Sequence, residues 1–218
     1  MDHSGCNFYS KFADEGNIDF TLVVITEMMR KYGHYSNFYG IELLNEPSTD
    51  LTYNDHSLLV SYYQQAYEII RSYHPTCYIV INELYEKAYR KWANDLQEPQ
   101  YYNVIMDYHL YNWQDPYTYQ TAEQHIENAL NWQSLLEFYS IQHPIIVGEW
   151  SMSTGIFLQV GQSFVDACVQ SFNQGSFGWY LWNWKIDRDQ SSLFETWDVQ
   201  YQLIEKGKEH GGLNPLKG

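Results

Sequence analysis

Short apolar runs alternate along this chain with amphipathic helical patterns, and no other feature restricts the possible folds as much. Five runs of strand length lie at residues 38–44, 77–82, 102–109, 144–150 and 177–184. They are almost continuously apolar, which is typical of strands that are covered on both faces. One helical pattern precedes the first run, at 18–32, and three others lie between runs, at 55–73, 121–139 and 158–173. This order predicts βα units and a parallel sheet.

Residues at the ends of the helical segments support these boundaries. Asp55 is a suitable N-cap for the second segment, and Thr121, followed two residues later by Glu123, opens the third. Gly175 comes just after the last periodic residue of the fourth segment, where helices often stop.

Two architectures fit this order: a (β/α)8 barrel and an open, doubly wound sheet. No GxGxxG or GxxxxGK[ST] motif follows any predicted strand, so the nucleotide-binding form of the open sheet lacks its usual signature. The chain has no low-complexity segment, short repeat or obvious linker. We therefore expect a single domain over residues 1–218.

Charge and hydropathy argue against two classes of partner. The formal net charge is -15, from 12 Lys and Arg against 27 Asp and Glu, and no basic stripe is present. Nucleic-acid binding needs clustered cations, so no nucleic-acid partner is expected. No run reaches the roughly 18 apolar residues of a membrane helix.

The cysteines give no sign of a metal site. Cys6, Cys77 and Cys168 are an odd number without a CxxC pair, which argues against a disulfide scaffold and against a thiolate zinc site. We expect small buried apolar residues, although one disulfide stays possible.

Polar and aromatic residues gather where the predicted strands end. In chain order these residues are Asn45, Glu46 and Pro47; Asn82 and Glu83; Asp107, His109 and Tyr111; Gly148, Glu149 and Ser151; and Trp182, Asn183 and Lys185. The carboxyl ends of parallel strands form one rim, which is where α/β folds place their active sites. The sequence thus predicts a polar, aromatic-rich site on this rim.

Two carboxylates on such a rim are typical of glycoside hydrolysis. One carboxylic acid protonates the leaving oxygen, and one carboxylate attacks or stabilises the anomeric carbon. Glu46 and Glu149 are our candidates for this pair. Asn45 is placed to hydrogen-bond a sugar hydroxyl, and Trp182 offers a flat face for a pyranose ring. Glu83 also ends a strand, but its Ile-Asn-Glu context lacks this flanking pattern, so we rank it behind them.

The ordered set resembles glycoside hydrolase family 5 of the clan A barrels, most closely its fungal-type exo-β-1,3-glucanase branch. "NEP" at 45–47 is similar to the family's fourth-strand motif, which implies that Glu46 is the acid/base. "VGEWS" at 147–151 is similar to the seventh-strand motif, which implies that Glu149 is the nucleophile.

Three further segments extend the resemblance. "DYHLY" at 107–111 is similar to the sixth-strand motif and implies that His109 and Tyr111 shape the site around the nucleophile. "GWYLWNWK" at 178–185 resembles the eighth strand, which makes Trp182 the sugar-stacking residue. "WDVQ" at 197–200 is similar to the exo-glucanase branch in particular.

The resemblance implies a retaining hydrolase of β-glucan, most closely a glucan exo-1,3-β-glucosidase that needs no metal or cofactor. β-1,4-Glucan and mannan are the next substrates in order, and the family implies an extracellular or cell-wall location. The alternative is a catalytically dead, carbohydrate-binding remnant. A nucleotide-dependent α/β enzyme is a third reading, without a glycine-rich loop to support it. Oligomeric state is not predicted.

The chain also departs from the family. Only 37 residues precede the strand that matches the fourth, and the second-strand Arg and third-strand His have no counterpart. A barrel of this class usually needs about 250 residues. The chain thus resembles the C-terminal five-eighths of a (β/α)8 TIM barrel, with five parallel strands and no first three βα units. We expect a partial gene product with two exposed sheet edges, or else a short protein that closes by dimerisation.

Overall fold

A computed structural model describes residues 12, 16–47, 55–82, 92, 95–113, 117–154, 161–186, 192–208 and 211–216. Cys6 and Glu83 lie outside these ranges, as do the first residues of the helical segment predicted at 158–173. The chain forms two compact units, Met1–Asp107 and Tyr108–Gly218. The prediction of one domain over the whole chain stays a prediction.

The strands form one five-stranded sheet in the order β1-β2-β3-β4-β5, and the pairs β1–β2, β2–β3 and β4–β5 are parallel. Their bounds are β1 Gly40–Glu42, β2 Tyr78–Asn82, β3 Val104–Leu110, β4 Ile145–Trp150 and β5 Trp179–Leu181. The order follows the chain without reversing, whereas a doubly wound sheet has a point where the strand order switches. The structure therefore favours the barrel-type reading of the sequence.

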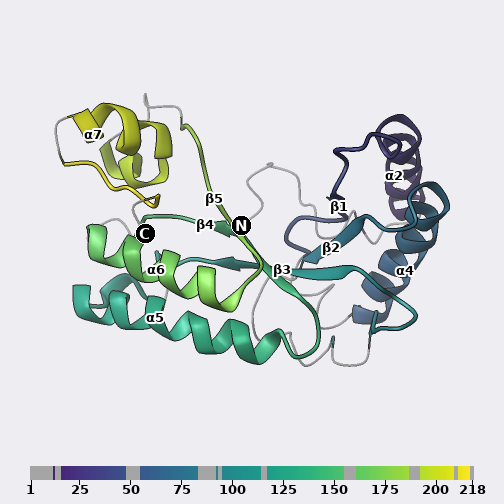
Figure 1. Ribbon diagram of the computed structural model, residues 1–218, viewed down its shortest axis with the longest axis horizontal. Coiled ribbons are helices and arrows are strands. Elements are labelled where there is room, and N and C mark those ends of the chain that lie inside the picture. Colours follow the sequence, from purple (N-terminus) through teal and green to yellow (C-terminus); the bar gives the residue numbers. More distant parts are fainter. Residues whose placement is uncertain are drawn as a thin grey trace. The chain divides into compact units, whose positions relative to one another are not determined.

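In the first unit, helices α2 (Asn17–Tyr32) and α4 (His56–Tyr73) lie side by side (Figure 1). α2 buries Leu22, Ile25 and Met29, a spacing that puts these side chains on one helix face. α4 buries seven residues along its length. Both helices match the predicted segments to within one residue at each end.

Two tyrosines of α4 hold the ends of neighbouring strands. The Tyr62 hydroxyl donates to the backbone oxygen of Leu43 at 2.7 Å, and the Tyr63 hydroxyl donates to that of Asn82 at 3.1 Å. Both side chains are fully buried, and burial raises the pKa of Tyr62. A neutral hydroxyl can donate to a carbonyl, so these bonds fix where β1 and β2 end relative to α4.

In the second unit, helices α5 (Ala122–Tyr139) and α6 (Gln162–Gly175) pack along each other (Figure 1). The Trp132 and Phe172 rings stack with centroids 5.5 Å apart, and the Ser171 hydroxyl donates to the Ala129 carbonyl at 2.6 Å. A Cβ at Gly175 would lie 2.9 Å from Leu136 Cβ, closer than packed side chains come. Gly175 thus permits the close approach of the two helices.

The C-terminal part of this unit consists of short helical turns. They are the 3-10 helix η4 (Ser192–Trp197), the π-helix η5 (Tyr201–Glu205) and α7 (Lys206–Lys208), and a further 3-10 helix, η2 (Tyr117–Tyr119), precedes α5. None of these turns was among the predicted helices.

The burial of two cysteines matches a sequence expectation. Cys77 and Cys168 are buried and form no disulfide, which confirms them as small core residues. β1 and β5 are the terminal strands of the sheet order, and Tyr39 beside β1 and Tyr180 within β5 are 79% and 64% exposed. Within the described part of the chain, no helix is both long and apolar enough to cross a bilayer.

Candidate functional site

Glu46 follows β1 in the first unit, and its backbone is held in an uncommon conformation. Its φ is 44°, in the left-handed region that non-glycine residues seldom adopt. Its N–H donates to the Asn82 Oδ1 atom at 2.9 Å, and buried Pro47 disfavours right-handed helical geometry at the residue before it. Such strain persists only where neighbouring groups fix it, which is common in functional sites.

Asn82 contacts the candidate residue Glu46, and the sequence interpretation did not select it. It is fully buried at the last position of β2, accepts the Glu46 amide, and donates through Nδ2 to the Asp107 carbonyl at 3.5 Å. Sequence reasoning noted the polar end of this strand but weighed only the acidic neighbour Glu83. An amide ending an otherwise apolar strand was the available signal. Asn45, by contrast, is exposed next to Glu46.

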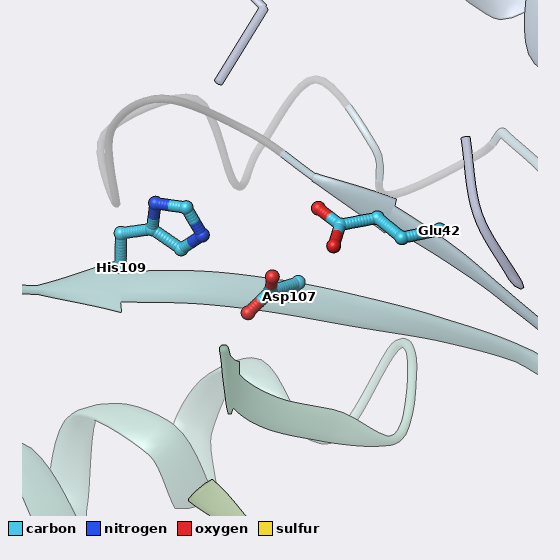
Figure 2. A group of neighbouring side chains, drawn as sticks. All are labelled: Glu42, Asp107 and His109. Carbon is cyan, nitrogen blue, oxygen red and sulfur yellow. The ribbon is translucent and has the colours of Figure 1, made fainter. Parts of the chain in front are cut away.

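Strand β3 places its aspartate and its histidine, Asp107 and His109, on the same face. Val104, Met106, Tyr108 and Leu110 are buried apolar residues, and Tyr108 stacks on Tyr139 of α5 at 5.3 Å. Asp107 and His109, two residues apart on the strand, both point to the other face (Figure 2). The Asp107 carboxylate lies within 4.8 Å of that of Glu42 in the first unit. The alternation explains why an apolar strand still presents polar groups.

In the second unit, two candidate residues meet the candidate nucleophile. The Tyr111 hydroxyl donates to Glu149 Oε2 at 2.6 Å, and His109 Nδ1 lies 3.5 Å from the same oxygen. The side chains of His109 and Glu149 are 3% and 18% exposed. A phenol and an imidazole on one carboxylate oxygen fix its orientation, and hydrogen bonds donated to a carboxylate favour its ionised form.

Aromatic packing anchors the strand end behind Glu149. The next residue, Trp150, is fully buried, with its ring 5.3 Å from Phe172 and 5.6 Å from Trp179. Its carbonyl accepts the Trp182 N–H at 2.8 Å, while the Trp182 side chain is 49% exposed. Trp182 is therefore fixed at its backbone and open at its ring, as stacking on a ligand requires.

The structure thus brings together part of the predicted set. Within the second unit His109 and Tyr111 meet Glu149, and Trp182 is tied to the neighbouring residue. Within the first unit Asn45 and Glu46 lie together after β1. The pairing of Glu46 with Glu149 stays a prediction.

The comparisons with known proteins agree on a family. The model of the family "Cellulase (glycosyl hydrolase family 5)" matches residues 7–188. Two curated relatives are named glucan 1,3-beta-glucosidase. That of Schwanniomyces occidentalis is 27% identical over 92% of this chain and 55% of its own length. That of Candida oleophila is 34% identical over 69% of this chain and 36% of its own length. The chain spans about half or less of these relatives.

Solved structures show the same fold. The endoglucanase Cel5A of Thermotoga maritima has a TM-score of 0.56 at 18% identity, covering 78% of this chain and 60% of the other. The endoglucanase Cel5A of Pseudomonas stutzeri has a TM-score of 0.56 at 19% identity, covering 77% and 55%. These similarities support a partial (β/α)8 barrel with helices between parallel strands.

Proposed function

The chain belongs to glycosyl hydrolase family 5, and on that basis we propose that it is the catalytic part of a retaining β-glucan hydrolase. The observation that best supports this proposal is the carboxylate of Glu149, held on one oxygen by Tyr111 and adjacent to His109 at the end of a parallel strand. A nucleophilic carboxylate must present its other oxygen to the substrate in one orientation. Two neighbours on the same oxygen give it that orientation.

The proposed reaction has two steps. In the first, a Glu149 oxygen forms a bond to the anomeric carbon while the glycosidic C–O bond breaks, and Glu46 gives its proton to the departing oxygen. In the second, Glu46 takes a proton from water, the water oxygen attacks the anomeric carbon, and Glu149 leaves. Both steps invert the anomeric centre, so the product keeps the configuration of the substrate.

The proposed substrate is β-1,3-glucan, attacked from a chain end. Both curated relatives above are named glucan 1,3-beta-glucosidase, and the half-exposed ring of Trp182 suits stacking on a pyranose. Asn45, exposed beside Glu46, is the proposed partner of a sugar hydroxyl. β-1,4-Glucan is the second choice, because the structural neighbours include endoglucanases. The proposed location is extracellular or in the cell wall.

A second candidate function is sugar binding without turnover. It is favoured by the half-exposed Trp182, whose ring can stack on a sugar whether or not the two glutamates react. In that case Trp182 and Asn45 would still bind a glucan, while Glu46 and Glu149 would have no catalytic role.

The test compares the purified chain with Glu149→Gln and Glu46→Gln variants. We expect release of aryl aglycone from an aryl β-glucoside, lost about a thousandfold or more in Glu149→Gln. The initial product anomer, followed by NMR, should be the β form. Glu123→Gln, at an exposed glutamate of α5, serves as the matched control and should keep full activity. Binding of laminari-oligosaccharides without hydrolysis would instead establish the second candidate.

A further inference from the structure

Tyr111 packs against Trp197, which in turn contacts Trp113, and the proposed reaction uses neither tryptophan. The Trp197 ring lies 5.6 Å from the Tyr111 ring, centroid to centroid, at an interplanar angle of 33°. Trp113 contacts Trp197 edge-on at 5.6 Å and 77°. All three residues belong to the second unit, as does Glu149, and neither tryptophan is fully buried. These three rings are called the Trp197 cluster below.

Strand pairing does not fix the position of Tyr111. β3 ends at Leu110, and Tyr111 is the first residue after it. Yet its hydroxyl lies 2.6 Å from Glu149 Oε2, a distance that demands a defined ring position. A flat aromatic neighbour such as Trp197 restricts the side-chain torsions that set this distance.

The backbone of Trp197 is itself fixed to the segment after β5. The Trp197 carbonyl accepts the Asn183 N–H at 3.1 Å, and the Asn183 carbonyl accepts the Val199 N–H at 3.2 Å. Buried Asp198 then closes the following turn by accepting the Tyr201 N–H at 2.8 Å. Asn183 comes directly after Trp182, so the same segment holds the proposed sugar platform and the ring behind Tyr111.

We propose that Trp197 is a positioning residue that holds the Tyr111 hydroxyl on Glu149. This inference rests on the proposed role of Glu149 as nucleophile, and it adds a residue to which the proposed reaction gives no part. Trp197 acts through Tyr111 by packing on its ring, while its backbone bonds to Asn183 couple that ring to the position of Trp182.

The direct test is the titration of Glu149 in the full chain. Glutamate labelled with ¹³C at Cδ is followed by NMR across pH, and Glu149→Gln assigns the signal. Tyr111→Phe removes the donated hydrogen bond, which should move the titration midpoint of Glu149 upward. Trp197→Leu keeps apolar bulk but loses the flat ring, and it should move the midpoint the same way, by about half a pH unit or more. Trp197→Phe should restore most of the native value.

Kinetics on an aryl β-glucoside provide the second readout. A displaced nucleophile lowers kcat, so Trp197→Leu should reduce kcat about tenfold and change KM less than twofold. Tyr67→Leu is the matched control, because Tyr67 packs on Tyr101 and Tyr102 within the first unit. It should lower the melting temperature while leaving the Glu149 titration and the acidic limb of the pH–rate profile unchanged.

The double variant decides whether the effect passes through Tyr111. Trp197→Leu added to Tyr111→Phe should cause no further shift, since the bond it acts on is already gone. An unchanged Glu149 midpoint in Trp197→Leu overturns the proposal, and so does a shift that adds fully to that of Tyr111→Phe. A chain without hydrolytic activity would contradict the proposed function. The NMR titration needs no turnover, so it would still test whether Trp197 positions the Tyr111 hydroxyl.

Discussion

At the residue scale, Arg71 shows how a charged group joins a helix to two strands of the first unit. Its guanidinium donates to the Cys77 carbonyl at 2.9 Å and the Tyr102 carbonyl at 2.7 Å. The same group lies over the rings of Tyr67 and Tyr102, 4.5 and 4.6 Å from their centroids. One planar cation thus satisfies two carbonyls just before β2 and β3 and stacks between two tyrosines.

Arg71→Lys should destabilise the chain by about 1–3 kcal/mol. A lysine ammonium cannot place two donors in the fixed fork of a guanidinium, nor stack as a plane between two rings. Urea unfolding followed by circular dichroism measures the change. Arg30→Lys is the control, since Arg30 pairs with Glu27 on the surface and is 63% exposed, and it should leave the free energy of unfolding unchanged within error. If the two substitutions change the free energy of unfolding equally, the two hydrogen bonds and the ring stacking of Arg71 do not account for its contribution.

Residues with a local signal could be predicted from the sequence, and residues defined by distant partners could not. Glu149 and His109 come at the ends of apolar runs, so the rim argument predicted them before their contact was known. Asn82 and Trp197 are recognised as site residues only through their contacts with Glu46 and Tyr111, which lie tens of residues away in the sequence. Nothing in the flanking sequence of Trp197 indicates which ring it packs against.

At the scale of single elements, helix α5 begins with a reciprocal cap. The Thr121 hydroxyl accepts the Gln124 N–H at 3.3 Å, and the Gln124 side-chain oxygen accepts the Thr121 N–H at 2.8 Å. The sequence interpretation paired Thr121 with Glu123, one residue too early, because a capping box joins the N-cap to the third helical residue. Glu123 instead hydrogen-bonds its own backbone and the Thr121 side chain, which lower its pKa.

Thr121→Ala should cost about 0.5–2 kcal/mol of unfolding free energy, because it leaves the Gln124 amide without its acceptor. Thr121→Ser keeps the hydroxyl and should lose only a small fraction of the unfolding free energy that Thr121→Ala loses. Thermal unfolding of both variants under identical buffer conditions separates the cap from the threonine methyl. If alanine and serine prove equally stable, the capping box contributes nothing to α5.

Element boundaries show which local signals were sufficient. α2, α4 and α5 end within one residue of their predicted limits, since apolar periodicity runs the whole length of each. β1 is only Gly40–Glu42, shorter than the predicted 38–44, because the terminal strand of a sheet pairs on one side only. Asp55 occupies the predicted N-cap of α4, yet its side chain makes no capping hydrogen bond.

At the scale of the whole chain, apolar surface is exposed in both units. On α2, Phe20, Val24, Met28 and Tyr32 recur every fourth residue and are 67%, 40%, 40% and 41% exposed. In the second unit Phe177 beside β5 is 78% exposed and Tyr180 within it 64%. Patches of this kind favour association with other apolar surfaces. The sequence predicted exposed edges, but which helix face stays uncovered depends on packing that periodicity does not specify.

Stability against pH should depend on one histidine buried in the second unit. His125, in the first turn of α5, is fully buried with its ring 6.2 Å from Phe164 of α6. Neither ring nitrogen has a hydrogen-bond partner among the residues that the structure describes. Burial lowers the pKa of His125 from its usual 6.5 because the charged ring would lose its hydration.

The direction of the pH effect follows from that lowered pKa. As pH falls through 6.5, the unfolded chain binds a proton at His125 while the folded chain does not, so the free energy of unfolding falls. The loss continues until the pH reaches the folded-state pKa and is absent above neutral pH. His125→Phe removes the titration and keeps an aromatic ring against Phe164. Between pH 7.5 and pH 5 the parent should therefore lose more unfolding free energy than His125→Phe.

Urea unfolding at several pH values measures this difference, and a second histidine variant controls it. Other carboxylates and histidines also contribute to the pH dependence of the parent, so the informative quantity is the gap between the parent and each variant. His34→Gln, at an exposed histidine of the first unit, should leave the pH dependence of unfolding unchanged. Parallel curves for the parent and His125→Phe would show instead that the buried ring takes up its proton in the folded chain as easily as in the unfolded one.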